Sequence, residues 1–98
     1  MVHIRVVSAQ NATGWTFTVQ VEEGNGQTRH SVNLSQRDFQ QLTSGAETTP
    51  EELVRKSFEF MLERESKNQI LRQFDLPVIE RYFPEYPAEI RKRLSPTR

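Results

Sequence analysis

The sequence predicts an α+β fold, namely a three-stranded antiparallel meander covered by one main helix, with a helical C-terminal third. Two observations carry this prediction. Apolar and polar residues alternate through the first third of the chain, as in strands with one buried face. Further on, a helix-capping sequence at Thr49 is followed by apolar residues at helical spacing.

We expect a single domain over residues 1–98, because a chain of this length can build one modest core. Residues 1–34 form the meander, and residues 35–65 form a short helical turn and the central helix. Residues 66–98 form a helical segment whose last residues are frayed.

Two strands are predicted before residue 23. Residues 2–7 alternate between apolar and polar side chains, and residues 15–22 alternate more strictly. The polar stretch 8–14 between them is predicted to be a loop. We expect the strands to pair with Val6 beside Trp15 and with Ile4 beside Phe17.

A hairpin is predicted between the second and third strands. Asn25-Gly26 is the best turn signal, because both central residues of a type I′ turn need positive φ. A turn at Gly24-Asn25 preserves the same faces, so the sequence leaves both registers open. Centring the turn on Asn25-Gly26 gives the pairs Glu22–Arg29, Val21–His30, Val19–Val32 and Phe17–Leu34.

The main helix has the clearest start in the chain. Thr49 can accept a hydrogen bond from the N–H of Glu52, and Pro50 fits the first helical position, where its missing N–H costs nothing. The apolar positions that follow span roughly half of the circumference, wider than the stripe of an ordinary surface helix. One side can cover the sheet, and the other needs a second neighbour, either residues 66–94 or another protein molecule.

Shorter helical elements are predicted on both sides of the main helix. Ser35 begins a short helical turn before it. Asp75, followed by Pro77, is typical of a new helix start, and residues 87–94 are predicted to form a last short helix. Between them, three apolar residues have helical spacing, namely Ile70, Leu71 and Phe74.

The composition excludes several classes of function. The chain has 13 Lys and Arg against 13 Asp and Glu, so no net charge draws it to nucleic acid or to an acidic membrane. It has no cysteine, which removes disulfides, thiolate metal sites and cysteine nucleophiles. It has neither a signal core nor an apolar run of membrane-spanning length, so we expect a cytoplasmic protein with no membrane partner.

No catalytic, cofactor-binding or metal site is predicted. His30 is in phase with Val32, at the rim of the buried face of the sheet, whereas His3 lies on the opposite face, so the two histidines do not share a metal ion. Ser31 points away from His30 in a strand, which argues against a serine–histidine pair. An enzyme is therefore the least favoured class.

A segment near the C-terminus suits a protein partner. Tyr82, Phe83 and Tyr86 lie with two prolines within six residues, and such aromatic side chains are enriched at interfaces. The prolines lower the entropy cost of presenting them. The structural alternative, of equal weight, is that Phe83 and one tyrosine pack back on the main helix.

Arg91, Lys92 and Arg93 are the candidate contacts to nucleic acid. Cations near the end of a final helix also stabilise its dipole without any ligand. In addition, the exposed face of the predicted sheet has no aromatic residue on which a base could stack. Solvated surface is therefore the favoured interpretation of these three residues.

Two resemblances follow from these residues. Most of the chain, including Thr49-Pro50-Glu51-Glu52-Leu53-Val54 and Arg81-Tyr82-Phe83-Pro84-Glu85-Tyr86, resembles a group of short bacterial proteins of unknown function, which implies a bacterial, cytoplasmic setting. The small sheet followed by a helix that opens Thr-x-Glu-Glu also resembles HicB-type antitoxins. This chain departs from them, because it lacks their loop with Pro, Gly and Cys and shows no DNA-binding motif after the helix.

The sequence therefore predicts a small non-enzymatic protein that needs no cofactor and acts through protein–protein interaction, self-association as a homodimer included. The alternative is a HicB-like antitoxin or another nucleic-acid-linked regulator. An enzyme with an unrecognised site comes last.

Overall fold

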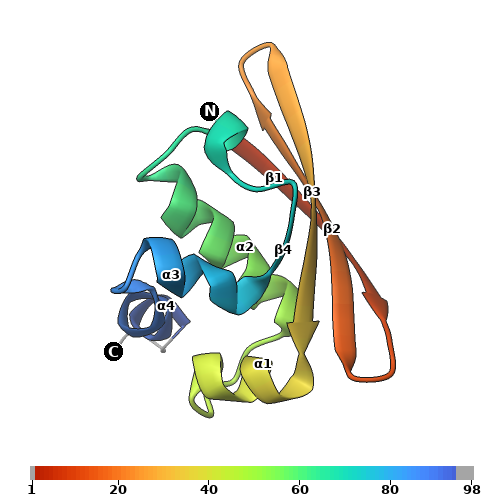
Figure 1. Ribbon diagram of the computed structural model, residues 1–98, viewed down its shortest axis with the longest axis vertical. Helices are drawn as coiled ribbons and strands as arrows, with labels where there is room; N and C mark the ends of the chain where they lie inside the picture. Colours follow the sequence, from red (N-terminus) through yellow and green to blue (C-terminus); the bar gives the residue numbers. More distant parts are fainter. Residues whose placement is uncertain (1, 95–98) are drawn as a thin grey trace.

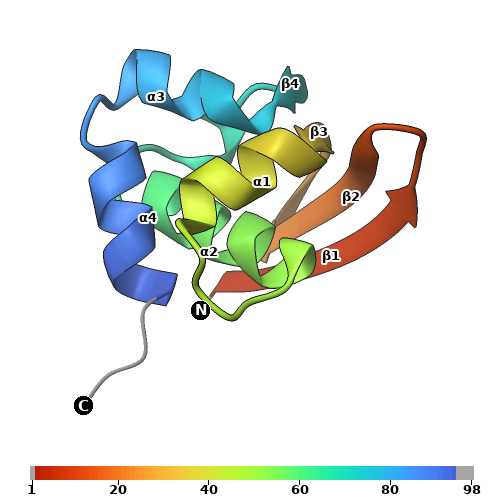
Figure 2. The same cartoon turned by 90° about the horizontal axis from the view of Figure 1, so that it is seen from below.

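The computed structural model describes residues 2–94 and confirms the α+β class (Figure 1). All of its helices lie on one face of the sheet, and none of the described elements covers the other face (Figure 2). The predicted fraying of residues 95–98 lies outside the described part of the chain. The elements are β1 (Val2–Gln10), β2 (Gly14–Glu23), β3 (Gly26–Ser35), α1 (Gln36–Thr43), α2 (Pro50–Leu62), the 3-10 turn η1 (Lys67–Gln69), β4 (Gln73–Asp75), the 3-10 turn η2 (Leu76–Val78), α3 (Ile79–Tyr82) and α4 (Tyr86–Leu94).

The sheet has four strands, one more than predicted. β1, β2 and β3 form the expected antiparallel meander, and β4 pairs in parallel with β3, with Phe74 beside Val32 (Figure 1). The N–H of Ser31 also donates to the carbonyl of Arg72 at 2.7 Å. The predicted helix over residues 66–74 is therefore wrong beyond η1, because the following backbone is extended along the edge of β3.

The β2–β3 hairpin turns at Gly24-Asn25. Gly24 has φ +59°, whereas Asn25 is not among the described residues with positive φ, which fits a type II′ turn with glycine in the first central position. The register accordingly pairs Glu23 with Gly26 and Val19 with His30. Of the two registers left open by the sequence, this is the second, and the pairing centred on Asn25-Gly26 is wrong.

The β1–β2 pairing differs from the prediction by four residues, because Val6 lies beside Val19. The strand β1 continues to Gln10, where Asn11 closes a tight turn by accepting a hydrogen bond from the N–H of Gly14 at 2.9 Å. A shift by an even number of residues keeps every side chain on its predicted face. The predicted pairs Val6–Trp15 and Ile4–Phe17 are therefore wrong.

The main helix α2 has the predicted start and contacts neighbours on two sides. Thr49 is its N-cap and accepts a hydrogen bond from the N–H three residues further on at 3.1 Å. On one side the ring of Phe58 lies 5.3 Å from the ring of His30 in β3. On the other side Phe60 lies 5.8 Å from Phe83. The second neighbour of α2 is therefore the C-terminal segment of the same chain.

Candidate interaction surface

The three predicted partner-binding aromatics do not share one surface. Tyr82, at the end of α3, is 64% exposed. Phe83 is half-buried, and Tyr86, the first residue of α4, is fully buried. The prediction that Tyr86 is available to a partner is thus corrected, since its side chain belongs to the core.

Tyr86 is buried because it joins α4 to α2. Its ring centroid lies 5.4 Å from that of Phe60, and its hydroxyl lies 2.6 Å from Oγ of Ser57. Ser57 donates its only hydroxyl hydrogen to the carbonyl of Leu53 at 2.7 Å, so Tyr86 is the donor to Ser57. Burial raises the pKa of the Tyr86 hydroxyl. The hydroxyl therefore stays protonated.

An apolar groove lies beside Tyr82. It forms where the end of α2 meets residues 69–74 and 78–83, and its volume is about 90 Å³. Leu71 and Tyr82 in its lining remain 44% and 64% exposed. This volume suits one side chain and is smaller than the roughly 300–1,000 Å³ of small-molecule sites. The apolar lining consists of Met61, Ile70, Leu71, Phe74, Val78, Ile79, Tyr82 and Phe83.

Glu65 and Gln69 are the polar residues of this lining, and Glu65 provides a carboxylate. Its side chain is partly buried, and burial raises the pKa of this carboxyl. Within residues 2–94 the carboxylate has no hydrogen-bond or ion-pair partner. Removing a carboxylate from water without a partner is unfavourable. The position therefore favours an added cation.

Of the residues that line this groove, the sequence analysis named Tyr82 and Phe83 as possible partner-binding residues but did not name Leu71 or Glu65. Leu71 was expected on a helix, whereas the structure places it between η1 and β4, outside any helix. Gln73, Phe74, Asp75 and Leu76 alternate between polar and apolar residues, but this run is too short to predict a strand by itself. Glu65 lies among other charged residues, and nothing local distinguishes it from a solvated helix end.

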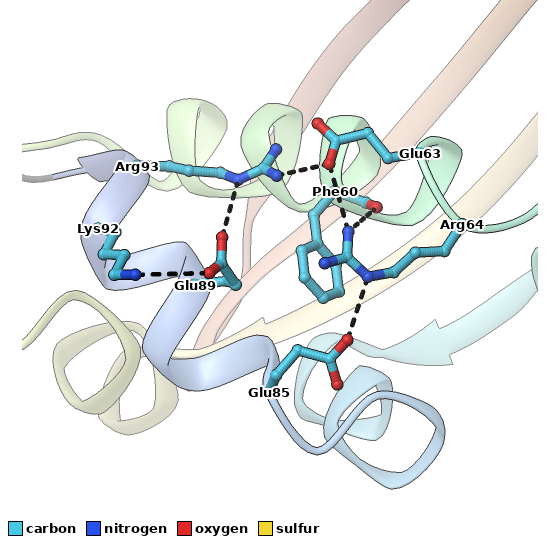
Figure 3. A network of polar contacts seen from close by, with 7 residues as sticks. All are labelled: Phe60, Glu63, Arg64, Glu85, Glu89, Lys92 and Arg93. Atoms are coloured by element: carbon cyan, nitrogen blue, oxygen red, sulfur yellow. Dashed lines mark hydrogen bonds and ion pairs between the residues drawn. The ribbon is translucent and has the colours of Figure 1, made fainter.

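The three predicted nucleic-acid contacts, Arg91, Lys92 and Arg93, are bonded to other parts of the chain. Arg93 lies 2.7 Å from Glu63 of the α2 end, and Lys92 lies 3.8 Å from Glu89 (Figure 3). Arg91 donates to a carbonyl of α1 at 2.8 Å. The bond from Arg93 lowers the pKa of the Glu63 carboxyl. The charges of Lys92 and Arg93 are thus matched by carboxylates of the same chain.

Arg64 extends this cluster toward the groove. Its guanidinium lies 3.7 Å above the ring centroid of Phe60, an arrangement that allows a cation–π contact. It also donates to Glu85 at 3.2 Å and to the Phe60 carbonyl at 3.0 Å (Figure 3). Arg64 therefore ties the connection between α3 and α4, which includes Phe83 of the groove wall, to the end of α2.

His30 is fully buried within β3, deeper than the predicted rim position. Its Nδ1 lies 2.8 Å from the Leu71 carbonyl, and its Nε2 lies 2.9 Å from the Thr28 hydroxyl. A carbonyl only accepts, so Nδ1 donates to Leu71 and Nε2 accepts from Thr28. Burial lowers the pKa of His30, the bond to Leu71 opposes this, and the positive charge of Arg72 lowers the pKa further. The neutral ring is therefore the form that suits the folded protein.

We expect the free energy of unfolding to decrease as the pH falls below about 6.5, the usual pKa of histidine. Below that pH the unfolded chain binds a proton that the buried ring of His30 resists, so the slope is at most about 1.4 kcal/mol per pH unit. The measurement is chemical unfolding of the wild type and His30→Gln over a pH series. The carboxylates are common to both proteins, so the difference isolates His30, and equal slopes would contradict this prediction.

A wider hollow of about 410 Å³ lies where the β1–β2 turn meets the start of α1. Trp15, Asn33, Asp38 and Asp75 are among its lining residues. Within the described residues, neither carboxylate is hydrogen-bonded to a serine, threonine or histidine side chain. The hollow therefore lacks the contact between a nucleophile and its base on which covalent catalysis depends.

Among residues 2–94, no three His, Cys, Asp or Glu side chains gather closely enough to hold a metal ion. No helix in this part of the chain combines the length and the apolar character needed to span a bilayer. Comparison of the chain with protein-family models, with curated proteins and with solved structures gives no match.

Proposed function

We propose that this chain is a non-enzymatic interaction protein that binds a protein partner through the groove beside Tyr82. The observation that carries the proposal is the exposure of two large apolar side chains at one apolar groove. Among the described residues, the exposed large apolar side chains are Val2, Val7, Leu71 and Tyr82, and the last two line this groove. Exposed apolar surface that is concentrated in one region is a feature of binding sites.

The walls of the groove support this role because they are fixed before binding. The ring of Phe83 packs edge-on against Phe60, and Arg64 bonds the following residues to α2. On the opposite wall, the Leu71 carbonyl accepts a hydrogen bond from His30. A preorganised surface loses little conformational entropy on association, and tyrosine is among the residues that contribute most at interfaces.

Nucleic-acid binding, as in an antitoxin-like regulator, has less support. Lys92 and Arg93 are paired with carboxylates, and the chain has no net charge. Affinity for nucleic acid depends mainly on cations that neutralise phosphates. Compensated cations contribute little to such binding.

The test is a selection of random peptides displayed on phage, with the immobilised full chain as the target. We expect the wild type to enrich peptides whose synthetic forms bind Tyr82→Ala at least about tenfold more weakly, because truncation of a central interface tyrosine typically costs more than 1 kcal/mol. Val7→Ala is the matched control, because it truncates a side chain that is 60% exposed on β1, away from the groove. Its affinity is expected to equal that of the wild type. If the wild type enriches no peptide, or if Tyr82→Ala retains the enriched peptides equally well, the proposed function is wrong.

A further inference from the structure

We infer that the segment of the partner protein that enters this groove carries a large apolar side chain and, close to it, an arginine or lysine that pairs with Glu65. This inference rests on the proposed function and specifies the chemistry of the partner at the same site. It commits to one occupant, a cationic and apolar segment of another protein.

The apolar part of the inference follows from the size and lining of the groove. A volume of about 90 Å³ accommodates one side chain, and the walls around it are built from Met61, Ile70, Phe74 and Ile79 together with the exposed Leu71 and Tyr82. An apolar side chain in the groove would bury its own apolar surface and that of Leu71 and Tyr82. A polar side chain would lose its hydration and find few hydrogen-bond partners, because only Glu65 and Gln69 in the lining are polar.

The cationic part follows from the charges around Glu65. The carboxylate is partly buried and has no partner among the described residues. The two nearest cations in the sequence are directed elsewhere. Arg64 bonds Glu63 and Glu85, and the ammonium group of Lys67 lies against Gly26 at the β2–β3 turn. The complementary charge must therefore come from outside the described chain.

Tyr82 adds a preference among cations. It lines the same groove as Glu65, and its ring is largely exposed. A guanidinium can stack on an aromatic ring while its fork of N–H groups meets a carboxylate, whereas an ammonium acts as a compact point charge. We therefore expect arginine to be selected more often than lysine.

The test uses the peptides enriched by the wild type in the selection described above. We expect most of them to combine a large apolar residue with an arginine or lysine no more than about one helical turn away. The strongest binder is then synthesised in two forms, one with its arginine and one with the neutral isostere citrulline, or with a lysine and norleucine. Each form is titrated against the wild type, Glu65→Gln and Glu80→Gln. Glu80 is the matched control, because it is exposed on α3 and does not line the groove.

For the wild type we expect the neutral peptide to bind about fivefold to tenfold more weakly than the charged one, with the difference shrinking as salt is added. Glu65→Gln is expected to bind both peptides with nearly equal affinity, whereas Glu80→Gln behaves as the wild type does. Such a result assigns the pairing to Glu65. Removing the charge of the peptide then has no further effect once the Glu65 carboxylate is gone, so the two changes remove the same interaction.

Three results would overturn the inference, and the first two leave the proposed function intact. In the first, the enriched peptides depend on Tyr82 but carry no cation. In the second, neutralising the cation weakens binding to the wild type and to Glu65→Gln by the same factor. In the third, the chain forms a dimer that Tyr82→Ala dissociates and with which the enriched peptide competes, which would make a second copy the occupant. Failure of the proposed function has a separate signature, namely peptides that bind Tyr82→Ala as well as they bind the wild type.

Discussion

Replacing Tyr86 with alanine is expected to lower the free energy of unfolding by about 3–5 kcal/mol, whereas Tyr82→Ala changes it by less than about 0.5 kcal/mol. The side chain of Tyr86 has 0% exposure and packs on Phe60, so its removal leaves a cavity between α2 and α4. The side chain of Tyr82 is 64% exposed, so its removal leaves none. A loss of this size is a large fraction of the roughly 5–15 kcal/mol that stabilises a typical domain.

The measurement is urea unfolding followed by circular dichroism for the wild type and three variants. The third variant, Tyr86→Phe, keeps the ring and removes the bond to Ser57. Because Ser57 keeps its bond to the Leu53 carbonyl, we expect Tyr86→Phe to cost only about 1 kcal/mol. If Tyr86→Ala cost no more than Tyr86→Phe, the packing of α4 on α2 would not be part of the stable core.

This comparison also separates the two tyrosines by function. A variant that unfolds loses every binding activity, so a loss of binding in Tyr86→Ala carries no information about the groove. Tyr82→Ala is expected to remain folded, and its binding therefore reports on the surface itself. The two residues looked equivalent as neighbours in a proline-rich stretch of sequence, yet they serve as distinct probes of fold and of binding.

The apolar periodicity of the sequence does not distinguish the two tyrosines. Apolar residues recur every three or four positions through the last part of the chain, and the pattern continues across Pro84, where one helix ends and the next begins. Tyr82, three residues after Ile79, and Tyr86, four residues after Tyr82, both fit this spacing. Only the packing separates them, because Tyr82 is exposed whereas Ile79, Tyr86, Ile90 and Leu94 are buried.

The faces of the first three strands could be predicted, but their registers could not. Alternation assigns Ile4 and Phe17 to the inner face whichever residues lie opposite them, because any even shift preserves the faces. The registers depend on turn geometry instead. Asn11 and Gly24 set the two turns, the first by side-chain hydrogen bonds and the second by its positive φ.

The groove was beyond sequence reasoning for a different reason. One of its walls depends on β4, a strand of three residues that pairs with β3 across a long stretch of chain, as Val32 does with Phe74. Local residue propensity does not predict so short a strand, because the strand is stabilised by its pairing with the edge of β3. Leu71 and Glu65 line one groove only in the folded chain, where this segment lies beside the end of α2.

Gly14→Ala is expected to lower the free energy of unfolding by about 3 kcal/mol or more, because the added methyl group overlaps backbone atoms that cannot move separately. A Cβ at this position would lie 2.1 Å from the Leu34 carbonyl oxygen and 2.7 Å from Cα of Ser35. Gly14 pairs with Ser35 at the end of β3, where α1 begins, so relief requires the strand ends to separate.

The matched control for this change is Gly24→Ala. Gly24 has φ +59°, and a Cβ there would meet nothing within 4 Å, so the expected cost is only the backbone strain of about 1–2 kcal/mol. The measurement is the urea midpoint of each variant. The comparison separates the steric clash expected in Gly14→Ala from the backbone strain expected in Gly24→Ala. A Gly14→Ala loss no larger than that of Gly24→Ala would show that β2 and the start of α1 do not approach as closely as the structure describes. The larger loss would instead identify Gly14 as the residue that allows the sheet to turn directly into the helical layer.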